Sequence, residues 1–464
     1  PIQVQYGGSN TLLGQIEAGG VGDLILVGED MYAEIACKKG LAREVVPVAV
    51  QRPVIAVRKD NPRRIQGLND LLRADVRVGL CNPEQAAIGR LFKEALGRTG
   101  RWRDLDRAVT ERGVFKPTVT DLANDLKLGT IDASILWDAL VRQNPELEAV
   151  ECPELKSSTA RIAMCVLTSV KAPAAALRFA RYFASRDRGQ PVFASMGYEA
   201  VEGDRWSESP QLTFFAGIVA RRALEETIRG FEEREGVVVT TVYNGCGILT
   251  GQMLAIRDKT QGGFPDLYLA GDRCFFENVK EHFQEAEELS ENGISMFVEK
   301  GNPKEIRALT DLTRAGIRVV VGQPEQCTIG HLTRKVLEEQ GIYHAVMKNV
   351  VSQVATSGML VPAATTGTCD VVLAWNSDLL GESGRLEAIP VESKHAKGTQ
   401  VLGIARSSDR KELARRLVAA IAASRASFES AGFVWRLDRL PAARNSALNE
   451  VNDGAIPRRR GKQP

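Results

Sequence analysis

The chain of 464 residues contains no apolar run near the roughly 18 residues needed to span a bilayer, so we expect no transmembrane helix. Its start, PIQVQYGGSN, lacks the layout of a secretory signal. Neither sign of charge is in excess, because 60 basic side chains are balanced by 58 acidic ones and the net charge is +2. This balance excludes a whole-chain field that would recruit nucleic acid or an anionic membrane.

Motifs of the common enzyme classes are also missing. The sequence has no GxSxG, HExxH, Walker or dinucleotide-binding pattern. Its 4 histidines, at 282, 331, 344 and 395, share no acid/base pattern. Glu84 and Glu325 recur in a PEQ motif, but each provides one carboxylate where glycoside hydrolysis needs two. We therefore expect no catalysis, and no cofactor is indicated.

Cysteine is present but lacks a diagnostic spacing. The 8 cysteines form no CxxC pair and no zinc-type pattern, so their spacing indicates neither a compartment nor a metal. Cys165 in RIAMCVLTS and Cys369 in GTCDVVLAW lie within apolar, strand-like runs. We expect both to be buried as small hydrophobic side chains.

The most informative positive feature is an internal repeat. Residues 67–96, GLNDLLRADVRVGLCNPEQAAIGRLFKEAL, return at 308–337 as ALTDLTRAGIRVVVGQPEQCTIGHLTRKVL, with roughly half of the positions identical. Two further matches follow the same order: QYGGSNTLLGQIEAG (5–19) with VYNGCGILTGQMLA (242–255), and GTIDASILWDAL (129–140) with GTCDVVLAWNSDL (367–379). The repeated unit is therefore a whole domain and not a short solenoid repeat.

The repeat sets the expected domain boundaries. We expect copy one at 1–203, a linker at 204–211, copy two at 212–440 and a weakly structured basic tail at 441–464. The opening segment of copy one, IQVQYGG, is expected to be a strand that matches the second strand of copy two. Copy one therefore lacks a first strand and helix, and we expect that segment upstream of Pro1.

Short β-branched runs alternate with amphipathic helices in both copies, which predicts an α/β fold with mostly parallel sheets covered by helices. The apolar stretches 45–62 and 294–303, with the later strands 161–169 and 399–407, are placed to cross twice between two lobes. Two tandem bilobed, hinged domains follow, each with a cleft at the carboxyl ends of strands.

Four kinds of segment reach this cleft. Ser9 and Asn10 open a helix after two glycines, where they could bind an anion or simply cap the helix. The turns NPEQAAIG (82–89) and QPEQCTIG (323–330) lead into helices, as do 118–129 and 352–367. Trp137 and Trp375 end equivalent strands and could form a pocket wall or pack in the core.

Taken together, these motifs resemble the periplasmic molybdate-binding proteins that serve ABC importers. The resemblance runs through GGSNTL, GDLILVGED, VRVGxxxPEQxxIG and the terminal FxxxGY or FxxAGF of each copy. It implies a periplasmic-binding-protein fold that holds a small tetrahedral oxyanion with neutral hydrogen-bond donors. It also implies an ABC permease as partner and a periplasmic location.

By position, the resemblance implies a ligand site in each copy. In copy one this site would use Ser9 with the neighbouring Asn10, the amides near Ile88 and Val119, and Trp137, where the family usually has tyrosine. In copy two the corresponding positions are Val219, Cys246, Ile329, Val354 and Trp375. Val219 and Cys246 replace hydroxyl residues of the family, so the resemblance implies molybdate or tungstate less firmly for copy two.

Two alternatives remain open from the sequence. Cys246, Cys274 and Cys327 all fall in loops after strands, with His331 one helical turn beyond Cys327, a set that would suit copper(I) or zinc. The lost hydroxyl positions also fit a structural or sensory protein with degenerate clefts. Arg221, at the start of a helix, could supply charge to an anion or be an ordinary exposed residue.

Overall fold

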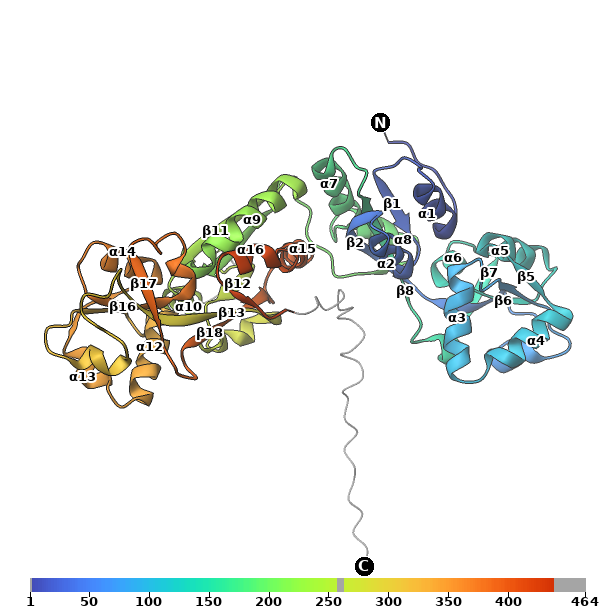
Figure 1. Ribbon diagram of the computed structural model, residues 1–464. Coiled ribbons are helices and arrows are strands. Elements are labelled where there is room, and N and C mark those ends of the chain that lie inside the picture. Colours follow the sequence, from blue (N-terminus) through green and yellow to red (C-terminus); the bar gives the residue numbers. More distant parts are fainter. Residues whose placement is uncertain (1, 257–262, 438–464) are drawn as a thin grey trace, which may run out of the picture. The chain divides into compact units, whose positions relative to one another are not determined.

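A computed structural model describes residues 2–256 and 263–437, and helices and strands alternate along the chain as predicted (Figure 1). The chain divides into two compact units. Within the described residues, unit one consists of 2–213, 228–240 and 407–416, and unit two of 214–227, 241–256, 263–406 and 417–437. Among the described residues, no helix combines the length and apolar character required to cross a bilayer. The tail predicted at 441–464 lies outside the described residues.

The first sheet of unit one has the strand order β1-β8-β2-β9, and neighbouring strands run antiparallel. Its strands are β1 (Leu24–Val27), β8 (Ala160–Leu167), β2 (Ala42–Gln51) and β9 (Glu199–Ala200). Along β8, Ala163 and Cys165 join the core on one face and Ile162 and Met164 the core on the other. This alternation explains why the strand reads as one continuous apolar run: both of its faces are covered.

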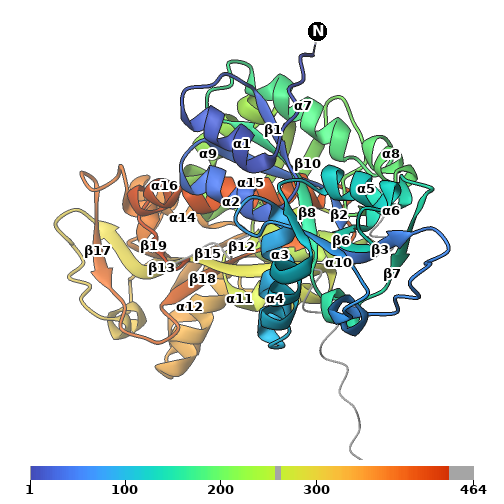
Figure 2. The same ribbon diagram turned by 90° about the vertical axis from the view of Figure 1, so that its right-hand side faces the viewer.

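Helices cover this sheet on both faces. The helices are α1 (Ser9–Glu17), α2 (Asp30–Lys38), α7 (Pro173–Ala184) and α8 (Gly189–Ser195). Helices α1 and α2 lie beside β1 and share one core with it, built around Leu13, Val27 and Tyr32 (Figure 2). Helix α7 packs on β2 and β8 through Ala180 and Ala184.

The second sheet of unit one has the order β5-β4-β6-β3-β7. Strand β4 pairs parallel with β5 and β6, whereas β3 pairs antiparallel with β6 and β7. The strands are β3 (Pro53–Arg58), β4 (Val78–Cys81), β5 (Val114–Lys116), β6 (Ala133–Trp137) and β7 (Leu147–Val150), and the helices are α3 (Ala87–Arg98), α4 (Trp102–Arg112), α5 (Val119–Leu128) and α6 (Asp138–Arg142). The predicted crossing segment 45–62 contains the end of β2 and all of β3, one strand in each sheet.

In copy two a single long strand connects the corresponding parts. Strand β13 (Phe283–Glu299) is 17 residues long; its first part pairs with β18 and its last part with β16. The sheet order is β11-β10-β12-β18-β13-β16-β14-β15, with β17 and β19 also on β13. The other strands are β10 (Gln211–Gly217), β11 (Val238–Asn244), β12 (Leu267–Ala270), β14 (Val319–Gly322), β15 (Val350–Val354), β16 (Val371–Trp375), β17 (Leu386–Pro390), β18 (Lys397–Ala405) and β19 (Val434–Trp435).

The helices of copy two alternate with its strands, as predicted for an α/β fold. They are α9 (Arg221–Glu235), α10 (Cys246–Ala255), α11 (Arg273–Glu277), α12 (Thr328–Glu339), α13 (Tyr343–Met347), α14 (Leu360–Thr365), α15 (Lys411–Ala423) and α16 (Arg425–Ser430). Helices α15 and α16 are separated by Ser424 alone, whose backbone leaves the helical region.

The repeat extends to individual turns and ion pairs. Asn61 and Asn302 both adopt a positive φ, and each side chain closes a turn onto the backbone four residues ahead. Arg77 pairs with Asp132 at 3.0 Å, and in copy two Arg318 pairs with Asp370 at 2.9 Å. The two copies therefore share their local construction as well as their sequence.

Two expectations are corrected by the structure. Residues 2–8 form no strand, so the strand predicted at IQVQYGG is wrong. Within the described chain β1 lies at the edge of its sheet, whereas its counterpart β12 has β10 as a parallel neighbour. The sheets are mixed and not mostly parallel, because the crossing strands β13 and β18 run antiparallel to their neighbours.

A buried ionic cluster joins three segments of unit one. Arg181 of α7 donates to the Glu235 carboxylate at 2.7 Å, and Arg416 of α15 donates to it at 2.6 Å. The side chain of Glu235 is only 3% exposed. Burial alone would raise the pKa of Glu235, but Arg416 and Arg181 outweigh it and lower that pKa. The carboxylate of Asp204, in the predicted linker, accepts the amides of Glu412 and Leu413.

Replacing Glu235 by glutamine should strongly destabilise unit one, since it leaves two buried guanidinium groups without their counter-charge. We expect the free energy of unfolding to fall by about 3–5 kcal/mol. Chemical denaturation followed by circular dichroism measures the change. The matched control is Glu429→Gln, which breaks an exposed pair with Arg425 and should cost no more than about 0.5 kcal/mol. Equal effects of the two substitutions would contradict the cluster's role.

Cysteine burial gives a second test. All eight thiols are free; Cys37 is exposed, Cys274 is half-buried and the other six are buried. Burial raises the pKa of Cys81, Cys152 and Cys165 to about 12, so their thiolate fractions at neutral pH are minute. An aromatic disulfide reagent at pH 8 should therefore modify one thiol rapidly in the native chain, and Cys37→Ser should remove that phase. Two or more rapid thiols in the native state would disprove the assignment.

Candidate functional site

The first side chain of the helices α1 and α10, which occupy equivalent positions in the repeat, is held in the same way in both copies. In copy one, the amide of Gly28, which follows β1, donates to Ser9 Oγ at 3.1 Å. In copy two, the amide of Gly271, which follows β12, donates to Cys246 Sγ at 3.1 Å. A turn after a strand therefore fixes the start of the preceding helix in each copy.

The two copies differ in what this side chain can offer. Because Ser9 Oγ already accepts a hydrogen bond from Gly28, its own hydroxyl hydrogen remains available to a ligand. Cys246 is 3% exposed, and burial raises the pKa of its thiol. A thiol is a weak donor. Copy one thus keeps a strong donor where copy two has a weak one.

Three helix starts in copy one present backbone donors. Helix α1 begins at Ser9, α3 at Ala87 and α5 at Val119, each with first-turn amides beyond the reach of intrahelical bonding. The Thr118 side chain caps α5 by accepting the amide of Asp121 at 3.1 Å. Strand β4 pairs parallel with both β5 and β6. The starts of α3 and α5, which come after β4 and β5, and Trp137, which ends β6, therefore lie at the same edge of the sheet.

The start of α3 also meets the other sheet of unit one. Ala87 packs against the core that includes Leu13 and Tyr32, and Arg90 forms an ion pair with Glu29 directly after β1. Ile88, beside them, is buried, Trp137 is 9% exposed and Asn10 is exposed. The segments predicted to bind in copy one therefore come from both sheets, and the α3 start touches the layer to which α1 belongs.

Copy two brings four of its predicted residues around one small cavity. Val219, Cys246, Ile329 and Trp375 line a space of about 10 Å³ together with Gly217, Asn244, Gly245, Thr328 and Ser357. A space of this size is comparable to that required by one water molecule, and a tetrahedral oxyanion is larger. Val354 is not among the lining residues; its carbonyl accepts the amide of Gln323 at 2.8 Å.

A backbone carbonyl takes up the first-turn amides of α10, the helix that begins at this small cavity. The carbonyl of Gln326 accepts the first-turn amides of Gly247 at 3.0 Å and Ile248 at 3.4 Å. A side chain at position 247 would lie 1.9 Å from the carbonyl oxygen of Glu325, so glycine is required by the close approach. The corresponding amides of copy one, Asn10 and Thr11, donate to no acceptor within the part of the chain that the structure describes.

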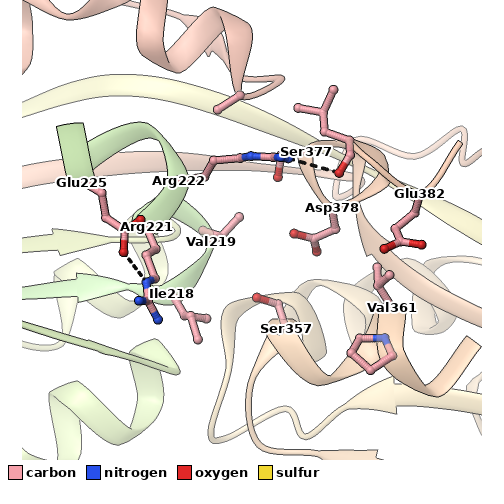
Figure 3. Close-up of a pocket in the computed structure, with 14 residues that line it drawn as sticks. Ile218, Val219, Arg221, Arg222, Glu225, Ser357, Val361, Ser377, Asp378 and Glu382 are labelled. Atoms are coloured by element: carbon pink, nitrogen blue, oxygen red, sulfur yellow. Dashed lines mark hydrogen bonds and ion pairs between the residues drawn. The ribbon is translucent and has the colours of Figure 1, made fainter. Parts of the chain in front are cut away.

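A larger cavity of about 400 Å³ adjoins the small one in unit two (Figure 3). Arg221 lies here and not in the small cavity. Its guanidinium pairs with Glu225 at 2.6 Å and lies 5.6 Å from the ring centre of Tyr243. Sequence analysis did not identify the other charged residues of this cavity, Arg222, Asp378 and Glu382, because none has a motif and Asp378 aligns with no acidic residue of copy one.

The structure does not favour the soft-metal alternative. Over residues 2–256 and 263–437, no three or more His, Cys, Asp or Glu side chains are grouped to hold a metal ion. Burial raises the pKa of Cys246 and Cys274, and raises that of Cys327 to about 11, which disfavours the thiolates that would bind copper or zinc. Cys327 Sγ instead lies 3.5 Å from the carbonyl of Gln323, and His331 packs on Phe275.

Comparison with known proteins agrees with this construction. The model of the bacterial extracellular solute-binding protein family matches the chain twice, over residues 1–199 and 212–434. The molybdate-binding protein ModA of Mycobacterium tuberculosis is 28% identical over 204 residues, which cover 43% of this chain and 74% of that protein. A binding protein of Haemophilus influenzae is 26% identical over 200 residues, with 42% and 79% covered.

Similar solved structures include two anion-binding proteins. The periplasmic molybdate-binding protein of Azotobacter vinelandii is 13% identical, with 48% of this chain and 98% of that chain covered and a TM-score of 0.40. The sulfate-binding protein SubI of Mycobacterium tuberculosis is 16% identical, with 48% and 86% covered and a TM-score of 0.41.

The two family matches together take up most of the chain, and they coincide with the two copies recognised from the internal repeat. The resemblance to solute-binding proteins predicted from the motifs is thereby confirmed. The chain belongs to the bacterial extracellular solute-binding protein family and carries that family's domain twice in tandem.

Proposed function

We propose that copy one captures a small tetrahedral oxyanion, of the molybdate, tungstate or sulfate kind, between its two lobes. The chain would act outside the cytoplasm and deliver this anion to an ABC permease. The observation that carries the proposal is the hydrogen bond from Gly28 to Ser9 Oγ, which leaves the hydroxyl proton free to donate. The molybdate-binding relatives support the class of ligand.

An oxyanion that leaves water must replace every hydrogen bond of its hydration shell. Copy one offers the Ser9 hydroxyl and the first-turn amides of α1, α3 and α5 as donors. The nearby Arg90 is already paired with Glu29, so the donors aimed at the anion would be neutral. A site of donors alone favours a fully ionised anion, because a protonated oxygen such as that of hydrogen phosphate would find no acceptor.

Copy two is less suited to the same ligand. Its equivalent position is Cys246, the amides of Gly247 and Ile248 are taken by Gln326, and its small cavity has the volume of about one water molecule. We therefore assign the oxyanion to copy one and expect one bound anion per chain. Two hinge crossings would allow the lobes of copy one to close around it.

Substituting Ser9 should weaken anion binding, because it removes a hydrogen bond to a charged ligand. We expect Ser9→Ala to raise the dissociation constant for molybdate by about 10- to 100-fold. Isothermal titration of the full chain with molybdate, tungstate, sulfate and phosphate gives affinities and stoichiometry, and phosphate should bind most weakly. The matched control is Cys246→Ala, the equivalent position of copy two, which should leave molybdate affinity unchanged.

Three outcomes would count against the proposal: no heat with any of the four anions, two equal sites per chain, or an unchanged affinity after Ser9→Ala. A circular-dichroism melt of each variant separates loss of binding from loss of folding. Protection of the parent chain against thermal unfolding by the bound anion provides an independent measure of the same affinity.

A further inference from the structure

The larger cavity of unit two is a separate place for a ligand. Its volume of about 400 Å³ is in the range of small-molecule sites, and it is lined by both apolar and charged side chains (Figure 3). It shares Ile218, Val219 and Ser357 with the small cavity but extends away from Cys246 and Trp375. Helix α9 contributes one wall, and the segments around α14 and after β16 contribute the other.

The α9 wall is positively charged at one point. Arg222 lies in the first turn of this 15-residue helix, and its Nη1 donates to the carbonyl of Leu380 at 3.1 Å. Among the residues that the structure describes, no carboxylate lies within 4.0 Å of the Arg222 guanidinium. The neighbouring Arg221 is already paired with Glu225. The partial positive charge of the helix start adds to that of Arg222, so this wall favours an anionic group.

The opposite wall has the reverse character. Asp378 follows β16, and its carboxylate accepts a single long hydrogen bond, from the amide of Trp375 at 3.3 Å. No basic side chain of the described chain pairs with it. Glu382 lies on the same wall, with its carboxylate 3.7 Å from Arg385 (Figure 3). Because the Asp378 carboxylate accepts only this one hydrogen bond and has no counter-charge within the described residues, a cationic group placed beside it would gain a strong interaction.

Between these walls the lining is mostly apolar. The apolar side chains are those of Ile218, Val219, Val361, Pro362, Leu380 and Ala431. The hydroxyls of Ser357 and Ser377 complete the lining, and both residues are buried. Such a surface accommodates a hydrocarbon side chain and leaves the recognition of the ligand's charged groups to Arg222 and Asp378.

We propose that copy two binds a small zwitterion of the amino-acid class in this cavity, with its carboxylate at Arg222 and its ammonium at Asp378. A ligand with one charge would leave either Arg222 or Asp378 without a partner, and an oxyanion would face three carboxylates, those of Glu225, Asp378 and Glu382. The inference goes beyond the oxyanion proposal: it concerns the other copy, another cavity and another class of solute.

The protonation of Asp378 gives the pH dependence of this binding. Burial raises the pKa of Asp378 to about 7, and the other charged groups on the cavity walls are Arg221, Arg222, Glu225 and Glu382. An amino acid stays zwitterionic between pH 6 and pH 8. Its affinity should therefore fall as the pH is lowered through about 7, where Asp378 gains its proton. Titration at pH 6, 7 and 8 measures this; an affinity constant across the range would count against the ammonium–Asp378 contact.

Matched ligands test the proposal without changing the protein. Isothermal titration of the full chain with leucine, leucinamide and 4-methylpentanoate compares the zwitterion with its cation-only and anion-only analogues. Leucine should bind at least about tenfold more tightly than either analogue, since each analogue lacks one charged contact. A panel of glycine, alanine and glutamate then defines the preferred side chain. Absence of binding by every amino acid tried at millimolar concentration, or equal binding by leucinamide, would overturn the proposal.

Substitutions of the two charged residues test whether leucine binds in this cavity. Arg222→Gln and Asp378→Asn should each weaken leucine binding about tenfold or more. The matched controls are Arg229→Gln, on the same helix, and Glu392→Gln; neither residue lines the cavity, so neither should change leucine affinity. Ser9→Ala should retain leucine binding, and Asp378→Asn should retain molybdate binding, so failure of one proposal is distinguishable from failure of the other. Unchanged leucine affinity in both cavity variants, with native melting curves, would overturn the assignment.

Discussion

Unpaired backbone amides at helix starts are the constraint around which both copies are arranged. Every α-helix leaves its first amides without an intrahelical acceptor, so each start must find a partner in the protein, in water or in a ligand. In copy two the carbonyl of Gln326 provides that partner for α10. In copy one the equivalent amides of α1 are left without one in the described chain, and the adjacent Ser9 keeps a free proton. In the same fold, the first amides of α10 are therefore hydrogen-bonded to the protein's own backbone, whereas those of α1 can bind a ligand.

Much of the fold could be predicted from the sequence because the repeat and the hydrophobic periodicity are strong local signals. The strands at 371–375 and 267–270 and the helix at 328–339 lie where their apolar runs and caps indicate. The expected strand at IQVQYGG is the main error. Its alternating pattern is adequate, but a strand forms only with a neighbour to pair with, and pairing is a property of the sheet that no local pattern encodes.

The candidate sites were predictable to different degrees. Ser9, Cys246, Ile329 and Trp375 could be identified because their motifs recur, and the structure gathers the last three with Val219. The cysteine and histidine set forms no metal group in the described chain, because His331 packs on Phe275 and because burial disfavours the thiolates of Cys246 and Cys327, although both line the small cavity. Arg222 and Asp378 are distant in sequence and carry no motif. Their significance depends on which counter-charges are absent, and only the packed structure reveals that.

The attachment of Asp204 to the start of α15 determines how the duplication can be taken apart. Asp204 lies in the polar segment between the repeats, yet its carboxylate accepts hydrogen bonds from two amides of a helix about 200 residues further on. The first compact unit likewise includes residues 228–240 and 407–416 of the second repeat. A gene cut at the repeat boundary would therefore give a first fragment that lacks two segments of its own compact unit, and a second fragment that carries those segments without the rest of that unit. The repeat boundary in the sequence is therefore not the boundary between the compact units.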